Sequence, residues 1–332
     1  QEQAAKLLHV SNLYHIEPQI RFARMLVERS FADKAFFCNS GAEANEAAIK
    51  LARKYGHERL GGRYELITMR DSFHGRTLAT ITATGQEKFQ AGFSPLPEGF
   101  RYAPFDDLPA LEAAITGRTC GVLLEPIQGE GGVRVPSAGY LQGVREICDR
   151  HNILMLLDEV QVGVGRTGTL FAYEQAGIRP DIVTLAKALG NGFPVGAMLT
   201  TDTIASAFQP GSHASTFGGN PLAMAACIAV FETLEADGVL ANCRKVGSHL
   251  IERLRRLQDR HDRIREVRGR GLLIGVELAG DAAEAVASCR ERGLLVITSG
   301  AGNVLRFVPP LILSKADADR AVDILDEVLK QP

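Results

Sequence analysis

The chain has 332 residues, of which 45% are hydrophobic, so it can bury one large core and a lesser one. Its 37 lysines and arginines face 39 aspartates and glutamates, which leaves a formal net charge of -2 without a long run of either sign. This balance excludes a surface built for nucleic acid or for an anionic membrane. We therefore expect a globular protein of two domains that binds small ligands.

The six cysteines are scattered, with no CxxC pair and no His/Cys cluster at metal-ligand spacing. This usage indicates reduced thiols, a cytoplasmic location and no metal site. No apolar run approaches the ~20 residues of a membrane span, and the opening QEQAAKLLHV lacks a signal-peptide pattern. Because that opening reads as the inside of a helix, we expect a further N-terminal segment before it.

Short apolar runs alternate with helical patterns such as AGYLQGVREICDRHN at 138–152. This alternation predicts an α/β fold with a mostly parallel sheet and crossover helices. The runs lack strict polar alternation, which is typical of strands buried on both faces. The predicted strands are YELITM at 64–69, CGVLLE at 120–125, ILMLLD at 153–158, DIVTLA at 181–186 and GAMLTT at 196–201.

The pattern changes after FGGNP at 217–221. We expect one long helix from about Pro221 that leads through the charge-rich IERLRRLQDRHDRIREV at 251–267, and a closing helix that ends at Leu329. Short strands between these helices predict a smaller α+β domain, with a boundary near residues 220 to 245. The strand candidates are GLLIGVEL at 271–278, GLLVITS at 293–299 and VLRFVPP at 304–310.

Lys187 follows a predicted strand within TLAKALGNGFPVGA, a stretch dominated by apolar residues and glycine. Ligands of open α/β sheets bind at the carboxyl ends of strands, where Asp158, Glu159, Glu125 and Glu130 also fall. A lysine that is desolvated there becomes a nucleophile toward carbonyls, which predicts Schiff-base chemistry. The alternative is a surface lysine whose stem covers apolar neighbours.

Asp158 is the candidate anion for the ring nitrogen of pyridoxal phosphate, because a protonated pyridine is the better electron sink. A helix N-cap or loop acid is its alternative role. Backbone donors for the phosphate would come from the turn Ser40-Gly41-Ala42 before a helical segment, unless this is an ordinary glycine turn. GVGRTG at 163–168 matches a dinucleotide fingerprint, but it neither follows a strand directly nor opens a helix, so we predict a loop.

Six motifs, in this order, together resemble one known family: NSGAEANEAAIKLAR, SFHGRT, EPIQGEGG, LLDEVQVGVGRTG, LAKALGNGFPVGA and STFGGNP. The chain is similar to the class III pyridoxal-phosphate-dependent aminotransferases of fold type I, over nearly its whole length. HVSNLYHIEP, FHGRT and RFVPP look most like the members that act on N-acetylornithine. The resemblance implies a remnant of an N-terminal segment over 1–20, a large cofactor-binding domain over 21–225 and a small C-terminal domain over 226–332.

The resemblance also implies a role for each residue that matches a family motif. Lys187 would bond to pyridoxal 5'-phosphate and shuttle the substrate proton, and Asp158 would keep the ring nitrogen protonated. Phe73 would stack on one face of the ring and Val160 would close the other. The other cofactor contacts would be Gln161 at the ring hydroxyl, the amides of Gly41 and Ala42 at the phosphate, and Thr216 at the phosphate from the partner subunit of an obligatory homodimer.

Arg76, Arg306, Glu130 and Ser215 are the substrate-binding residues that the resemblance implies. An arginine fork matches a carboxylate, so Arg76 would clamp the α-carboxylate of N-acetylornithine and Arg306 that of glutamate. Glu130 would pair with Arg306 while the donor with one free carboxylate is bound. Surface salt bridges are the alternative for both arginines.

Three functional hypotheses remain open. The first is transfer of the terminal amine of N-acetylornithine to 2-oxoglutarate, giving N-acetylglutamate semialdehyde and glutamate for arginine biosynthesis. The second is another ω-aminotransferase that acts on ornithine, 4-aminobutyrate, a diamine or succinyl-diaminopimelate. The third is an inactive binding protein that retains the fold.

Overall fold

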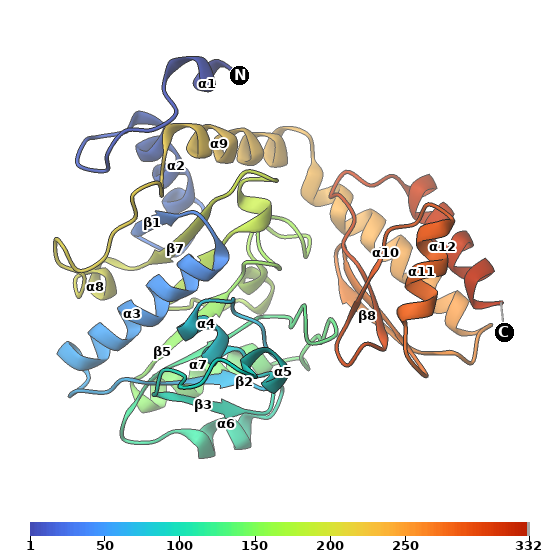
Figure 1. The fold of residues 1–332 in the computed structure, drawn as a ribbon, viewed down its shortest axis with the longest axis horizontal. Coiled ribbons are helices and arrows are strands. Elements are labelled where there is room, and N and C mark those ends of the chain that lie inside the picture. The colour runs from blue at the N-terminus through green and yellow to red at the C-terminus, as the bar shows by residue number, and fades with distance from the viewer. Residues whose placement is uncertain (331–332) are drawn as a thin grey trace. The chain divides into compact units, whose positions relative to one another are not determined.

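The computed structural model describes residues 1–330, which form two compact units (Figure 1). The first unit holds residues 1–126, 136–164 and 173–233. The second unit holds residues 127–135, 165–172 and the chain from Leu234 onward. Each unit is therefore assembled from segments that are separate in the sequence.

Seven strands form the sheet of the first unit: β1 Lys34–Cys38, β2 Glu65–Met69, β3 Phe100–Ala103, β4 Thr119–Leu124, β5 Leu154–Asp158, β6 Ile182–Leu185 and β7 Gly196–Thr200. Their order is β1-β7-β6-β5-β4-β2-β3. Strands β3, β2, β4, β5 and β6 pair in parallel, whereas β7 is antiparallel to both β6 and β1. The predicted mostly parallel α/β sheet is confirmed, and all five predicted strands lie within one residue of the observed bounds.

The direction of β7 follows from the short connection that precedes it. Residues 186–195 join β6 to β7, and a parallel crossover needs a dozen or more residues. The chain therefore turns back and pairs antiparallel. Since β1 is antiparallel to β7 in turn, β1 points the same way as β6, and its carboxyl end reaches the same edge of the sheet.

Helices cover this sheet, and the longest of them, α3 (Gly41–Arg59), packs across β4, β5, β6 and β7. The predicted crossover helix at 138–152 is α7 (Tyr140–His151), whose buried residues recur at helical spacing. The remaining helical segments are α1 Glu2–Lys6, α2 Glu17–Glu28, α4 Leu78–Ala83, α5 Glu87–Gln90, α6 Leu108–Ala114, η1 Ala172–Ala176, η2 Lys187–Leu189, α8 Asp202–Ala205 and α9 Pro221–Ala236.

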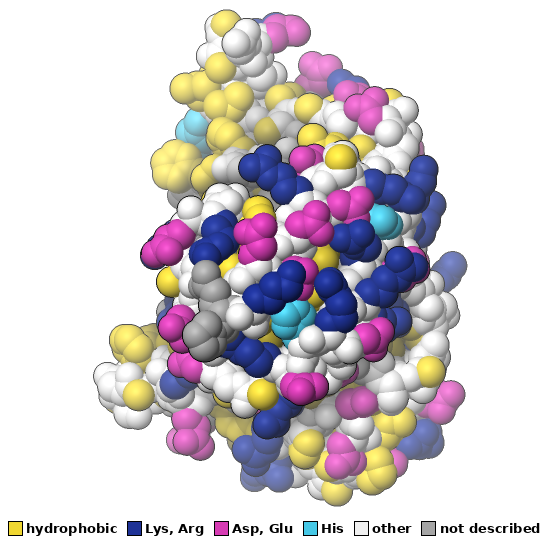
Figure 2. All heavy atoms as spheres, turned by 90° about the vertical axis from the view of Figure 1, so that its right-hand side faces the viewer, with side chains coloured by type: hydrophobic (Ala, Val, Ile, Leu, Met, Phe, Trp, Pro, Cys, Tyr) yellow, Lys and Arg dark blue, Asp and Glu magenta, His cyan; other side chains and the backbone are white. Residues whose placement is uncertain are grey.

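Within the described residues, the second unit contains a four-stranded antiparallel sheet of order β10-β11-β9-β8 together with three helices. Its elements are α10 Val239–Gln258, β8 Ile264–Arg270, β9 Leu273–Leu278, α11 Ala283–Glu291, β10 Ile297–Ser299, β11 Val304–Phe307 and α12 Lys315–Leu329. Helix α10 packs on β8 and on α12 around one apolar core. Acidic and basic side chains are interspersed on the face shown in Figure 2. Ion pairs of the second unit include Arg253 with Asp323 and Arg260 with Asp326.

Two expectations for this region are wrong. The long helix from Pro221 is two helices, because the chain breaks at Gly238, which has a positive φ of 62°. The charge-rich segment 251–267 is not helical throughout, since α10 ends at Gln258 and β8 begins at Ile264. Ile264 and Val267 are both buried although they lie three residues apart, because the register of β8 shifts between Ile264 and Glu266.

The segment GVGRTG at 163–168 contains neither helix nor strand, as predicted. The six cysteines are free and buried, and burial raises the pKa of Cys38, Cys120, Cys148 and Cys227 to about 12. In residues 1–330, no helix combines the length and the apolar character that crossing a bilayer requires.

Candidate active site

The candidate site begins where strands of the first unit end at one edge of the sheet. Asp158 is the last residue of β5, and Lys187 follows β6 by two residues. Gly41 opens α3 just after β1. A Cβ atom on Gly41 would lie 2.8 Å from Val160 Cγ1 and 3.5 Å from the Cβ of Ala186, so the three segments are in close contact.

The first turn of α3 leaves two backbone donors available. The hydroxyl of Ser40 caps the helix by accepting from Glu43 N at 3.2 Å, and the carboxylate of Glu43 turns back to accept from Asn39 N at 2.9 Å. Within residues 1–330, no acceptor pairs with the amides of Gly41 and Ala42. Together with the positive end of the helix dipole, these amides make the turn at 40–42 a candidate anion-binding cup.

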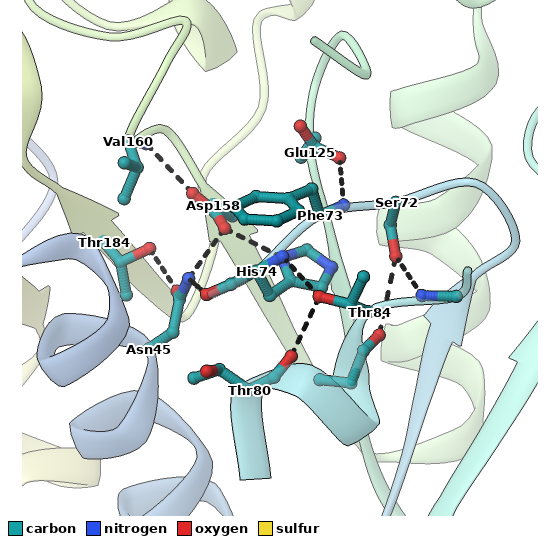
Figure 3. Close-up of polar contacts among 12 residues, drawn as sticks. Asn45, Ser72, Phe73, His74, Thr80, Thr84, Glu125, Asp158, Val160 and Thr184 are labelled. Carbon is teal, nitrogen blue, oxygen red and sulfur yellow. Dashed lines mark hydrogen bonds and ion pairs between the residues drawn. The ribbon is translucent and has the colours of Figure 1, made fainter. Parts of the chain in front are cut away.

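Asp158 is buried, with 3% of its surface exposed, and donors surround its carboxylate (Figure 3). Its Oδ2 accepts from Asn45 Nδ2 at 2.8 Å and lies 2.7 Å from His74 Nδ1. Its Oδ1 accepts from Val160 N at 3.0 Å. The amide of Asn45 is oriented in turn by Thr184, whose hydroxyl donates to Asn45 Oδ1 at 2.7 Å. The side chain of Asp158 is thus held in one orientation.

Three of these neighbours are functional candidates that sequence reasoning missed: Asn45, His74 and Thr184. Nδ1 of His74 faces Asp158, and its Nε2 is buried without a hydrogen-bond partner among the described residues. This pattern fits the tautomer with its proton on Nδ1, because a second N–H would be buried without an acceptor. The available signal for Asn45 was an amide among alanines on the buried face of a helix.

Phe73 lies in a loop that is fixed at several points (Figure 3). Its amide donates to Glu125 Oε2 at 3.1 Å, and the buried Glu125 follows β4 at the same edge of the sheet. Gly75 has a φ of 140°, and a Cβ atom there would lie 2.9 Å from the Cβ of Ala42. The Phe73 loop therefore packs against the anion-binding cup.

Lys187 is exposed, so the expected desolvation of its amine is not found in the single chain. The residue begins the short helix η2 at the open edge of the sheet, where side chains meet solvent. None of residues 1–330 pairs with its Nζ. Its backbone has a positive φ of 48°, which is unusual for a residue with a side chain.

Arg76 is also exposed and lies over aromatic rings rather than beside an acid. Its guanidinium carbon is 4.3 Å from the ring centroid of Phe89 and 5.4 Å from that of Phe73. Within the described part of the chain, no carboxylate pairs with it. The alternative that Arg76 forms a surface salt bridge therefore has no support.

Glu130 and Arg306 lie together in the second unit. Glu130 Oε1 is 2.7 Å from Arg306 Nη2, with 32% of the Glu130 side chain and 7% of the Arg306 side chain exposed. The carbonyl of Glu130 also accepts from Gly300 N at 2.9 Å. This ion pair joins residues 176 positions apart and is partly withdrawn from water.

Three further predicted residues lie in the first unit: Ser215, Thr216 and Gln161. Ser215 Oγ accepts from Gly218 N at 2.9 Å and from Asn39 Nδ2 at 3.3 Å, which is a turn-stabilising arrangement. Thr216 is exposed, and Gln161 is half-buried. The functional roles of all three stay predictions.

Solved structures with this fold define the class of protein. The chain superposes on a crystal structure of ornithine aminotransferase from Toxoplasma gondii ME49 with a TM-score of 0.95 and 32% identity, covering 99% of this chain and 80% of that one. N-acetylornithine aminotransferase from Stenotrophomonas maltophilia K279a gives 0.84 and 40% identity, with 99% and 84% covered. The fold is fold type I of the pyridoxal-phosphate-dependent transferases.

Sequence comparison narrows this class to a family. Residues 1–329 match the family described as aminotransferase class-III. Acetylornithine aminotransferase of Caldanaerobacter subterraneus subsp. tengcongensis is 53% identical over 332 residues, which cover 99% of this chain and 84% of that protein. The chain belongs to the class-III aminotransferase family. It is therefore an enzyme, a transaminase, and the hypothesis of an inactive binding protein is not supported.

Proposed function

We propose that the chain transfers the terminal amine of N-acetylornithine to 2-oxoglutarate, with pyridoxal 5'-phosphate as cofactor. The observation that carries this proposal is the meeting of an unpaired lysine, a buried acid and two free helix amides at one edge of the sheet. The substrate comes from the names of the relatives, since a protein 53% identical is called acetylornithine aminotransferase.

The residues at this edge fit the cofactor. Gly41 and Ala42 have two free amides for a phosphate, and a side chain at position 41 would collide with Val160, because its Cβ atom would lie 2.8 Å from Val160 Cγ1. When bound, pyridoxal phosphate supplies a ring that withdraws electrons and stabilises negative charge on the substrate carbon. Phe73 and Val160 would flank that ring, and Gln161 would hydrogen-bond to its hydroxyl.

The chain's own groups would then move and hold protons. The carboxylate of Asp158, fixed by the neighbours described above, would hold a proton at the ring nitrogen. The amine of Lys187 would hold the cofactor between turnovers, and during a turnover it would act as the base that removes the substrate proton and as the acid that returns it. Its exposure suits this task, because a mobile amine must reach two carbon atoms in turn.

Two arginines suit substrates that differ in the number of carboxylates. Arg76 would bind the α-carboxylate of N-acetylornithine, with Ser215 as a further substrate contact. Arg306 would bind the α-carboxylate of glutamate after its release from Glu130. An ion pair that masks the second arginine lets one enzyme accept the donor with one free carboxylate and then the acceptor with two.

We also propose that the enzyme is a homodimer in which Thr216 completes the phosphate site of the partner subunit. The exposure of Thr216 leaves its hydroxyl accessible to a second chain. Sedimentation equilibrium combined with activity measurements would check this, and a fully active monomer would contradict it.

Rates measured on a panel of ω-amines with 2-oxoglutarate would test the function. N-acetylornithine should give the highest kcat/KM, and the cofactor's near-visible absorbance band should disappear on treatment with borohydride. Free ornithine is the second candidate, because ornithine aminotransferases superpose with a TM-score of 0.95. A preference for ornithine over N-acetylornithine would replace the proposed substrate, and failure of every amine would contradict the proposal.

A further inference from the structure

Arg76 lies over the ring of Phe89, a residue that no motif of the sequence singled out. The guanidinium of Arg76 is closer to the ring centroid of Phe89, at 4.3 Å, than to that of Phe73, at 5.4 Å. The rings of Phe89 and Phe73 meet edge to face, with centroids 5.6 Å apart and an interplanar angle of 80°. One half-buried ring thus touches both the arginine and the aromatic residue predicted to stack on the cofactor.

The segment that carries Phe89 is held firmly. Gln90 Nε2 donates to the carbonyl of Thr84 at 2.8 Å and lies 3.0 Å from the hydroxyl of Tyr102. Gln86 Nε2 donates to the carbonyl of Ser72 at 2.9 Å, directly before Phe73. The short helix α5 is therefore tied at both ends to the loop and helix that flank Arg76, so the ring of Phe89 has a fixed place.

A ring differs from a carboxylate as a support for an arginine. The negative face of an aromatic ring attracts a guanidinium without occupying its N–H groups in the plane. A carboxylate partner would occupy those N–H groups, as Glu130 occupies Nη2 of Arg306, and would compete with an incoming carboxylate. Arg76 is thus oriented while its fork of donors remains available.

We propose that Phe89 is a specificity-determining positioning residue, which holds the guanidinium of Arg76 beside Phe73 so that it can bind the α-carboxylate of the amino donor. This inference rests on the proposed function, since it assigns the donor's carboxylate to Arg76. It implies that Phe89 contributes to substrate binding without touching the reacting atoms.

Phe89→Leu and Phe89→Met remove the π face and keep an apolar side chain, whereas Phe89→Tyr keeps the ring. We expect KM for N-acetylornithine to rise about two- to thirtyfold in the first two variants, the range that corresponds to one cation–π contact, and kcat to stay within about twofold. Phe89→Tyr should restore the wild-type KM. The cofactor absorbance should be unchanged in all three.

Phe100→Leu is a matched control, because Arg53 lies 4.9 Å over the Phe100 ring in the same unit. It should lower the melting temperature without changing KM. An unchanged KM in a folded Phe89→Leu or Phe89→Met variant would overturn the inference, and so would equal damage by Phe89→Tyr. If the wild type does not use N-acetylornithine, the proposed function fails by itself, and the same comparison is made with the carboxylate-bearing ω-amine that it does use.

Discussion

Replacing Glu130 by Ala should change which substrate the enzyme prefers rather than how fast it reacts. In the folded chain, the carboxylate of Glu130 lies 2.7 Å from Arg306 Nη2. In the proposed function, glutamate must displace this carboxylate before its own can bind. The variant removes that competition, so glutamate should bind more tightly. N-acetylornithine should be used less well by comparison, because Glu130 no longer covers Arg306 while this donor is bound.

The size of the effect follows from the exposure of the pair. A hydrogen bond to a charged group contributes about 1.5 to 3 kcal/mol. Because 32% of the Glu130 side chain is exposed, water screens the pair and the lower value applies. About 1.5 kcal/mol corresponds to roughly tenfold, so kcat/KM for glutamate should rise about tenfold relative to that for N-acetylornithine.

Stopped-flow measurement of each half-reaction at the cofactor absorbance band separates the effect on glutamate from the effect on N-acetylornithine. Glu277→Ala is the matched control, since Glu277 pairs with Arg268 at 2.6 Å in the same unit and its side chain is 26% exposed. It should lower stability and leave the substrate ratio unchanged. If Glu130→Ala slows both half-reactions equally, or changes neither, Glu130 does not act as a gate.

Three further substitutions test the cofactor site. Lys187→Ala should lower transamination at least about a thousandfold with an unchanged far-ultraviolet spectrum, because its amine both binds the cofactor and moves the proton; substantial turnover with 2-oxoglutarate would refute the assignment. Asp158→Asn should keep the cofactor bound and lose about a hundredfold in single-turnover rate, since a neutral amide cannot hold the ring nitrogen protonated; a near-normal rate would argue against this role. Gly41→Ala should weaken cofactor affinity in a titration and lower stability by about 1 to 3 kcal/mol, because its Cβ would lie 2.8 Å from Val160 Cγ1; wild-type values would show that the loop yields.

Much of the fold could be predicted because buried strands carry a strong local signal. The five apolar runs of the first unit each coincide with a strand, since burial on both faces excludes polar residues. The antiparallel direction of β7 depends on the length of its connection, which the sequence contains but the apolar pattern does not express. The break at Gly238 and the strand at 264–270 were not predicted, because the charged residues in this region are as compatible with the surface of a helix as with the solvent-exposed face of a strand.

Some site residues can be recognised from their neighbours in the sequence, whereas others are identified only by contacts between distant segments. Lys187 and Asp158 end apolar runs, so strand-end reasoning reaches them. His74 contacts Asp158 directly. Thr184 orients the Asn45 amide that donates to Asp158, and only the fold shows that these segments meet. Neither the spacing nor the composition of the chain indicates that residues 127–135 and 165–172 join the second unit.

At position 187, the backbone conformation favours one residue type and the proposed chemistry requires another. A φ of 48° is a conformation that glycine adopts freely and that costs a residue with a side chain about 1 kcal/mol. Selection for stability alone would favour glycine at this position, whereas in the proposed function selection for turnover keeps the amine. If Lys187 has the role proposed for it, a consensus or stability-driven redesign of this chain must hold position 187 fixed, because a glycine there would relieve the backbone and remove the amine.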